Sequence, residues 1–241
     1  MLSEEFNVSM SKNVSIILST YNEKLSIEFT ISELIKHLPG VEIIVVDDNS
    51  PDGTLDILEK INYENLKIFS RKKTKGLASA FLLGLINTRG NVIGWVDSNM
   101  GQVVKKFPEM LKNLNQNDIV ILSRYIPGGK DERSKFRVIV SSLLNKFSKL
   151  ILRSNINDLS SGIFLMNRKV LNDTVPVAKG HGEFIIEFLY RAEKKGNRII
   201  EIPYTHPVDL EGNSKSFPNL GKFLQFGFFY FIRIIQMLIR E

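Results

Sequence analysis

Residues 42–54 have the sequence EIIVVDDNSPDGT, an apolar segment that runs directly into two acids and a turn. The apolar part, residues 42–46, is rich in isoleucine and valine and has the length of a strand that is buried on both faces. The part after it consists of residue types that favour turns. Buried strands with polar carboxyl ends are typical of open α/β sheets, in which ligands bind beyond those ends.

The segments around this strand follow the same plan as far as about residue 125. Helical patterns alternate with apolar runs, and the helix at 25–37 stops at Pro39-Gly40, a pair that ends helices. The further strands are predicted at residues 14–18, 92–96 and 119–122, and the further helices at residues 54–61 and 77–86. This alternation predicts an α/β fold with a Rossmann-like, mainly parallel sheet flanked by helices.

The alternation weakens in the second half of the chain. The patterns there predict a long helix at 133–152, a strand at 162–167, a helix at 184–195 and a strand at 198–204. We find no internal repeat and no low-complexity linker. We therefore predict one domain, residues 1–216, followed by an amphipathic helix, residues 217–241.

Composition narrows the classes of function. The 241 residues include no cysteine, which excludes disulfides and cysteine-ligated metals. Residues 1–13 carry two acids and no apolar run, so we do not expect them to form a secretory signal peptide. The net charge of +6 fits ligands that carry phosphate or anionic lipid. We do not expect nucleic acid as a partner, because the basic residues are not interleaved with aromatic residues.

Acids and amides follow two of the predicted strands. Asp47 and Asp48 could accept hydrogen bonds from a ribose or a base, although the turn alone would also explain them. Asp97 and Asn99 follow the strand at 92–96 and offer oxygen ligands two residues apart. Such a pair suits Mg²⁺ or Mn²⁺ that bridges a diphosphate. We expect both strand ends to face one site.

Seven segments, in order along the chain, resemble the motifs of family 2 glycosyltransferases, in particular the dolichol-phosphate mannose synthase branch. They are STYNE (19–23), VVDDNSPDGT (45–54), KGLASA (75–80), DSN (97–99), SRY with GG (123–129), DLSSG (158–162) and GNSK (212–215). The resemblance implies a GT-A fold. It also implies a hexosyltransferase that moves a mannose- or glucose-class sugar, with inversion, from a nucleotide diphosphate sugar to a polyprenyl or dolichyl phosphate.

The resemblance also suggests roles for residues inside or near these motifs. The nucleotide sugar would be bound by Thr20, Tyr21, Glu23, Asp47, Asp48, Lys75 and Gly76. The candidates for the metal are Asp97 and Asn99, and the candidate catalytic and phosphate-binding residues are Asp97, Arg124, Arg137 and Lys215, with Arg133 beside them. An acceptor phosphate is already anionic, so transfer needs positioning and stabilisation of the departing diphosphate rather than a strong base.

Some positions depart from the family pattern. Asn99 replaces the second acid of the usual Asp-x-Asp, and Gly101 stands where the family has glutamine. Asp209, Leu210 and Glu211 occupy the place of an arginine that usually precedes the last motif. These departures leave two alternatives open. One is a non-catalytic module that binds a nucleotide sugar, and the other is a transferase for a glycan acceptor, with Glu183 as its base.

The C-terminal segment is very apolar and aromatic. Its polar residues Lys222, Gln225, Arg233, Gln236 and Arg240 are spaced so that they share one helical stripe. No uncharged run approaches the roughly 20 residues of a transmembrane helix. We expect a helix in the membrane interface with its basic residues toward anionic headgroups, or a helix that binds a membrane-embedded partner. With the helix in the interface, the enzyme would work on the cytoplasmic face of a membrane. The alternative is that the helix packs on the helix at 133–152.

Overall fold

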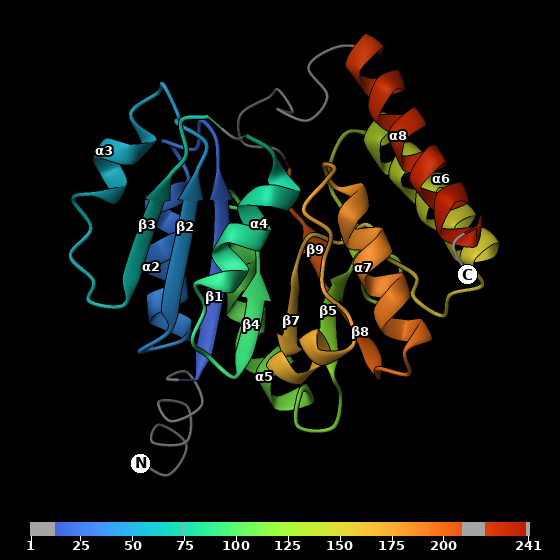
Figure 1. The fold of residues 1–241 in the computed structure, drawn as a ribbon, viewed down its shortest axis with the longest axis horizontal. Coiled ribbons are helices and arrows are strands. Elements are labelled where there is room, and N and C mark those ends of the chain that lie inside the picture. The colour runs from blue at the N-terminus through green and yellow to red at the C-terminus, as the bar shows by residue number, and fades with distance from the viewer. Residues whose placement is uncertain (1–12, 74, 209–219, 240–241) are drawn as a thin grey trace.

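The structure is a computed structural model that describes residues 13–73, 75–208 and 220–239. Seven strands form one sheet in the order β3-β2-β1-β4-β7-β5-β8 (Figure 1). They are β1 (Val14–Thr20), β2 (Glu42–Asp47), β3 (Leu66–Ser70), β4 (Val92–Trp95), β5 (Ile119–Ser123), β7 (Phe164–Asn167) and β8 (Ile199–Pro203). Neighbouring strands are parallel except at β7, which is antiparallel to β4 and β5.

Helices cover both faces of this sheet. They are α2 (Ile27–His37), α3 (Thr54–Leu58), α4 (Leu77–Ile86), α5 (Phe107–Asn113), α6 (Lys135–Leu152), α7 (Glu183–Lys194) and α8 (Leu220–Ile239), with 3-10 helices η1 (Gly101–Lys106) and η2 (Arg168–Asn172). Two short strands, β6 (Lys130–Asp131) and β9 (Thr205–His206), pair with each other outside the main sheet. The predicted α/β sheet with flanking helices is therefore present.

Three local features differ from the sequence-based expectation. The helix expected at 54–61 ends at Leu58. Strand β3 lies at the edge of the sheet and is only partly buried, so Lys67 interrupts its apolar pattern and hides it in the sequence. Helix α5 is only seven residues long and begins at Phe107-Pro108, which is too short for a clear helical period.

The hydrophobic core lies on both sides of the sheet. Because side chains alternate along β1, Ile16 and Leu18 pack into a cluster with α2 and α5, whereas Ile17 packs into a second cluster with α4 and α7. The second cluster also takes in Ile234 and Met237 of α8. The apolar residues of β1, β2, β4 and β5 are thus buried from both faces, as the continuous apolar runs predicted.

Aromatic rings connect the two halves of the sheet in the second cluster. Phe81 of α4 lies 4.5 Å from Trp95 of β4 and 5.6 Å from Phe184 of α7, measured between ring centroids. Phe164 of β7 lies 5.9 Å from Phe81 and 5.7 Å from Phe188. The contacts of Phe81 with Trp95 and Phe164 are edge-to-face, and the other two are tilted; aromatic pairs of this kind stabilise the fold beyond simple burial. They fix the first turn of α7 against the end of β4.

We predict that Gly84→Ala and Gly227→Ala have opposite effects on stability, although both replace a helical glycine. A β-carbon at Gly84 would lie 2.4 Å from Ile17 Cγ2, so overpacking should lower the free energy of unfolding by about 1–3 kcal/mol. At Gly227 nothing lies within 4 Å, so alanine should raise it by up to about 1 kcal/mol. Urea unfolding of both variants measures the difference, and equal shifts would contradict the packing described here.

Candidate active site

The polar residues that follow the strands meet at the carboxyl edge of the sheet. The last residues of β1 and β2, Thr20 and Asp47, are register partners, and the Thr20 hydroxyl donates a hydrogen bond of 2.9 Å to Asp47. Asp97 follows β4, which is the other neighbour of β1. Arg124 follows β5. The order of strands therefore brings the predicted motifs to one edge.

Asp47 holds the turn that follows β2. Its carboxylate is fully buried and accepts hydrogen bonds from Thr20 and from the backbone and side chain of Ser50. Ser50 in turn accepts a hydrogen bond from the backbone N–H of Asn22, which joins the turns after β1 and β2. These contacts give Asp47 a structural task, and its contact with a nucleotide stays a prediction.

Asp48 organises the loop before α4. It forms an ion pair with Arg71, and its second oxygen accepts a hydrogen bond of 2.7 Å from the backbone N–H of Gly76. Arg71 also donates to Ser79 and to the Gly76 carbonyl. Gly76 has φ of +131°, a backbone conformation that favours glycine. Arg71 and the direct hydrogen bond thus bring the predicted nucleotide residues Asp48 and Gly76 together.

Lys75, which belongs to the loop before α4, lies beside Tyr21. The Lys75 ammonium lies 5.0 Å from the centroid of the Tyr21 ring, and Tyr21 is 45% exposed. An exposed ring with a cation beside it can stack on a nucleobase while the cation attracts phosphate. The arrangement fits the roles expected for both residues, and these roles stay predictions.

Asp97 and Asn99 point to solvent on either side of buried Ser98. Ser98 is held on both sides, because its hydroxyl donates to the Ser19 carbonyl and its own carbonyl accepts from Thr30. This anchoring fixes the backbone that carries the two exposed oxygen ligands. A β-carbon at Gly162 would lie 3.3 Å from the Asp97 carboxylate, so the glycine leaves room beside it.

The environment of Asp97 disfavours the charged form of its carboxylate in the free protein. The side chain reaches solvent, but protein encloses it on its other sides, and this loss of solvation raises the pKa of Asp97 to about 6. The negative charge of Glu23 acts in the same direction. Glu23 itself is mostly buried, and its carboxylate accepts a hydrogen bond from Ser26. A cation near Asp97 would relieve this repulsion.

Arg124 lies inside the protein. Its guanidinium makes two hydrogen bonds to Asp158, at 2.8 and 2.7 Å, and lies 3.6 Å from Asp131. Its side chain is only 5% exposed. Because two carboxylates and Ser160 already take up its donors, this conformation favours a positioning role over direct contact with a substrate phosphate.

Arg133 continues this chain of charges toward solvent. It pairs with Asp131, and its positive charge also influences Asp97 and His206. Arg137 follows within the first turn of α6 and is partly exposed. Lys215, like Asp209, Leu210 and Glu211, lies outside the described residues. Within the described residues, no group of three or more histidine, aspartate or glutamate side chains is arranged to hold a metal by itself.

Glu183 begins α7 and is buried. Its carboxylate accepts a hydrogen bond of 3.0 Å from the backbone N–H of His181, so it closes the loop before the helix. The role of a base, which we considered for a glycan acceptor, remains untested.

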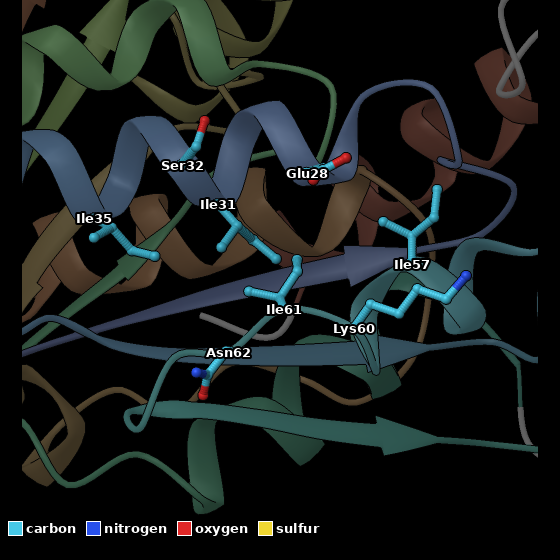
Figure 2. Close-up of a pocket in the computed structure, with 8 residues that line it drawn as sticks. All are labelled: Glu28, Ile31, Ser32, Ile35, Ile57, Lys60, Ile61 and Asn62. Carbon is cyan, nitrogen blue, oxygen red and sulfur yellow. The ribbon is translucent and has the colours of Figure 1, made fainter.

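One pocket of about 370 Å³ lies away from these residues. It is formed between α2 and the segment that contains α3, and Figure 2 shows the isoleucines that line it, namely Ile31, Ile35, Ile57 and Ile61. None of the predicted site residues lines this pocket.

Comparison with known proteins agrees with the fold and the motifs. The family model for Glycosyl transferase family 2 matches residues 15–175. The dolichol-phosphate mannosyltransferase of Pyrococcus furiosus is 31% identical over 209 residues, which make up 84% of this chain but only 58% of that protein. The polyprenol monophosphomannose synthase of Mycolicibacterium smegmatis is 29% identical over 219 residues, covering 86% of this chain and 82% of that protein.

Solved structures resemble this chain in fold. Glucosyl-3-phosphoglycerate synthase from Mycobacterium tuberculosis, in complex with Mn²⁺, UDP and glucosyl-3-phosphoglycerate, has a TM-score of 0.73 at 15% identity and covers 96% of this chain and 82% of its own. TarS residues 1–349 from S. aureus have a TM-score of 0.59 at 22% identity, over 80% of this chain and 60% of their own. The predicted GT-A type of α/β fold is confirmed.

We predict that His206 makes the protein less stable in acid. Burial lowers the pKa of His206 to about 4, from 6.5, and the charge of Arg133 acts in the same direction. Between these two values the unfolded chain binds a proton that the folded chain does not, so the free energy of unfolding falls as the pH is lowered through this window.

Urea unfolding above and within the window measures this loss, and His206→Asn should reduce it. His37→Asn is the matched control, because the His37 Nε2 atom lies 3.3 Å from a carboxylate oxygen of Glu33, whereas the charge of Arg133 acts on His206. An unchanged pH dependence in His206→Asn would show that another group is responsible.

Proposed function

Because the chain belongs to glycosyltransferase family 2, we propose that it transfers a mannose- or glucose-class sugar, with inversion, from a nucleotide diphosphate sugar to a polyprenyl or dolichyl phosphate at a membrane surface. The observation that carries the proposal is the exposed pair Asp97 and Asn99, held at the carboxyl end of β4 by buried Ser98. The relatives named dolichol-phosphate mannosyltransferase and polyprenol monophosphomannose synthase support the acceptor class. The chain spans only 58% of the first of these, so substrate and activity are carried over as part of the proposal.

Asp97 and Asn99 fit a Mg²⁺ or Mn²⁺ ion that is shared with the substrate. Mg²⁺ is usually held by one or two carboxylates, with water and substrate phosphates completing its shell, so a cage of three acids is not required. Glucosyl-3-phosphoglycerate synthase, which resembles this chain in fold, has been solved in complex with Mn²⁺ and UDP and with Mg²⁺ and UDP. When bound here, the ion would stabilise the negative charge of the departing diphosphate.

The donor would lie over the ends of β1 and β2. The exposed Tyr21 ring would stack on the base, and Thr20, the last residue of β1, and Glu23, in the turn after it, would contact the nucleotide beside it. Lys75, on the loop that Asp48 and Arg71 hold, would attract the diphosphate. Asp47 would contribute by holding the turn.

The acceptor phosphate would approach from the side of Arg133 and Arg137, at the beginning of α6. Lys215 remains a candidate for the same phosphate. Because a phosphate oxygen is anionic at neutral pH, these cations would orient the nucleophile and no side chain would need to remove a proton. Arg124 would act by fixing Asp131 and, through it, Arg133.

A face of exposed apolar residues supports membrane contact. Helices α6 and α8 lie side by side on the outer side of α7 (Figure 1). We call their outward-pointing residues the α6–α8 face: Phe136, Ile139, Leu143, Leu150, Phe228, Phe229, Phe231, Leu238 and Ile239. Many exposed apolar side chains on two neighbouring helices favour contact with a membrane or a partner. Within the described residues, no helix combines the length and the apolar character needed to cross a membrane.

The orientation of α8 corrects one expectation. The polar stripe was expected to face headgroups, but Arg233 points inward and pairs with Glu187 of α7. The helix also packs on the domain, with Phe147 of α6 stacked on Phe231, as the alternative in the sequence analysis predicted. Membrane contact would therefore use the apolar side of α8. The expected boundary at residue 216 lies outside the described residues, as does Arg240, and the side chains of Lys222 and Gln225 are likewise not described.

We predict that Asp97→Ala abolishes the metal-dependent part of nucleotide diphosphate binding, because it removes the only exposed carboxylate of the pair. Asn99→Asp should tighten that binding, since it adds a charge toward the cation. Calorimetry with GDP and UDP, with and without Mn²⁺, measures both effects. Asp173→Ala, at an exposed aspartate after η2, is the control. Unchanged affinity in Asp97→Ala would rule out this assignment.

We predict that a double substitution on the α6–α8 face, Leu143→Ser with Phe228→Ser, weakens association with anionic vesicles by about tenfold or more. The substitutions remove two large exposed side chains from the apolar area that the membrane would bury. Co-sedimentation with phosphatidylglycerol vesicles provides the measurement. Ile86→Ser is the matched control, because Ile86 is 71% exposed but lies at the end of α4. Equal pelleting of the double variant and the control would contradict membrane contact through this face.

A further inference from the structure

Helix α8 contacts the loop that precedes α7. Arg233 donates a hydrogen bond of 2.8 Å to Glu187, one turn into α7, and another of 2.8 Å to the backbone carbonyl of Lys179. The side chains of Arg233 and Glu187 are only 14% and 7% exposed. A single guanidinium thus ties α8 both to α7 and to residues 179–182, which we call the 179–182 loop.

A second residue of α8 meets the same loop. A β-carbon at Gly182 would lie 2.0 Å from the hydroxyl oxygen of Tyr230, so the tyrosine is seated directly on this glycine. At Gly180, where φ is +116°, a β-carbon would lie 2.6 Å from Glu183 and 3.2 Å from the Arg233 guanidinium. Both glycines therefore make room for groups that meet at the loop, and the contact is closely fitted from both sides.

The loop leads into the site. Glu183 closes it, and the next residue, Phe184, packs 5.9 Å from Trp95 at the end of β4. Asp97 follows Trp95 by two residues. Burial raises the pKa of Tyr230, and the negative charges of Glu183 and Asp97 act in the same direction, so the Tyr230 hydroxyl lies within electrostatic range of both carboxylates.

We propose that Tyr230 and Arg233 are positioning residues for sugar transfer. They hold the 179–182 loop and the first turn of α7 in a fixed position relative to Asp97. The inference deepens the proposed function and rests on it. It gives α8 a task in the reaction that is separate from membrane contact, because Tyr230 and Arg233 contact the 179–182 loop and α7, while Phe228 and Leu238 belong to the α6–α8 face. The loop would be set only when α8 is seated.

The test compares Arg233→Met, Arg233→Lys and Tyr230→Ala with wild type in the full chain. Transfer from GDP-mannose and from UDP-glucose to a short-chain polyprenyl phosphate in detergent micelles avoids any dependence on vesicle binding. Lys195→Met, at the other end of α7, is the control. It also removes one positive charge, but from an exposed residue. Circular dichroism and thermal unfolding show whether each variant is folded.

We expect kcat to fall by about tenfold to a hundredfold in Arg233→Met and Tyr230→Ala, with the KM of the donor within about twofold of wild type, because misplacement of the loop affects the reaction rather than donor binding. Arg233→Lys should recover part of kcat, since it keeps the charge that faces Glu187. Trypsin should cleave after Lys179 faster in Arg233→Met than in Lys195→Met, because the backbone contact at Lys179 is lost.

A folded Arg233→Met with wild-type kcat would overturn the inference, and so would a donor KM that rises in step with the fall in kcat. Wild-type protein that transfers sugar to no polyprenyl phosphate would overturn the proposed function together with the inference. Active wild type with unaffected variants would overturn the inference alone.

Discussion

The buried ion pair between Arg124 and Asp158 connects more of the molecule than any other polar contact described above. It joins the end of β5 to the segment before β7, and Glu201 of β8 binds the backbone N–H of Asp158 at 2.9 Å. Through Asp131 it also reaches β6 and Arg133. A desolvated pair of this kind adds little net stability, but removing one partner leaves an unpaired buried charge, which costs about 3–5 kcal/mol. The pair therefore keeps β5, β7, β8 and β6 in one arrangement, and the cations at the start of α6 depend on that arrangement.

The acids at the carboxyl edge have different tasks although they follow equivalent strands. Asp47 and Asp48 use their oxygens to hold the turn after β2 and the loop before α4. Asp97 and Asn99 remain exposed, because buried Ser98 between them makes the local hydrogen bonds instead. A ligand oxygen is useful only when the protein has not already satisfied it. The division between structural and exposed acids supports the proposal that the end of β4 is the centre of the site.

Periodicity and motifs predicted the sheet, most helices and the carboxyl-edge location of the motif residues, because these depend on local patterns. The pairing of Asp48 with Arg71 depends on a contact 23 residues apart. It could have been derived from the parallel register of β2 and β3, in which Asp47 faces Ser70, so that the following residues are neighbours. Strand β3 was missed because it is a partly buried edge strand, and the register was lost with it. The partner of Arg124 could not be derived in this way, because 34 residues and a long helix separate Arg124 from Asp158.

The orientation of α8 shows why helical spacing alone does not decide which side of a helix meets solvent. A polar stripe on an apolar helix usually faces water or headgroups. In α8, Arg233 of that stripe finds Glu187 on α7, and two charges that are buried together require each other. Meanwhile Ile234 and Met237 enter the core, and the remaining apolar residues are left outside. A helix with apolar residues nearly all round can pack on the domain and still present apolar side chains outward, provided that an inward cation such as Arg233 has a partner. Glu187 supplies that partner, and it stands one turn from Glu183, where α7 meets the 179–182 loop. In the mechanism that we propose, the ion pair that orients α8 is also the contact through which α8 would position that loop.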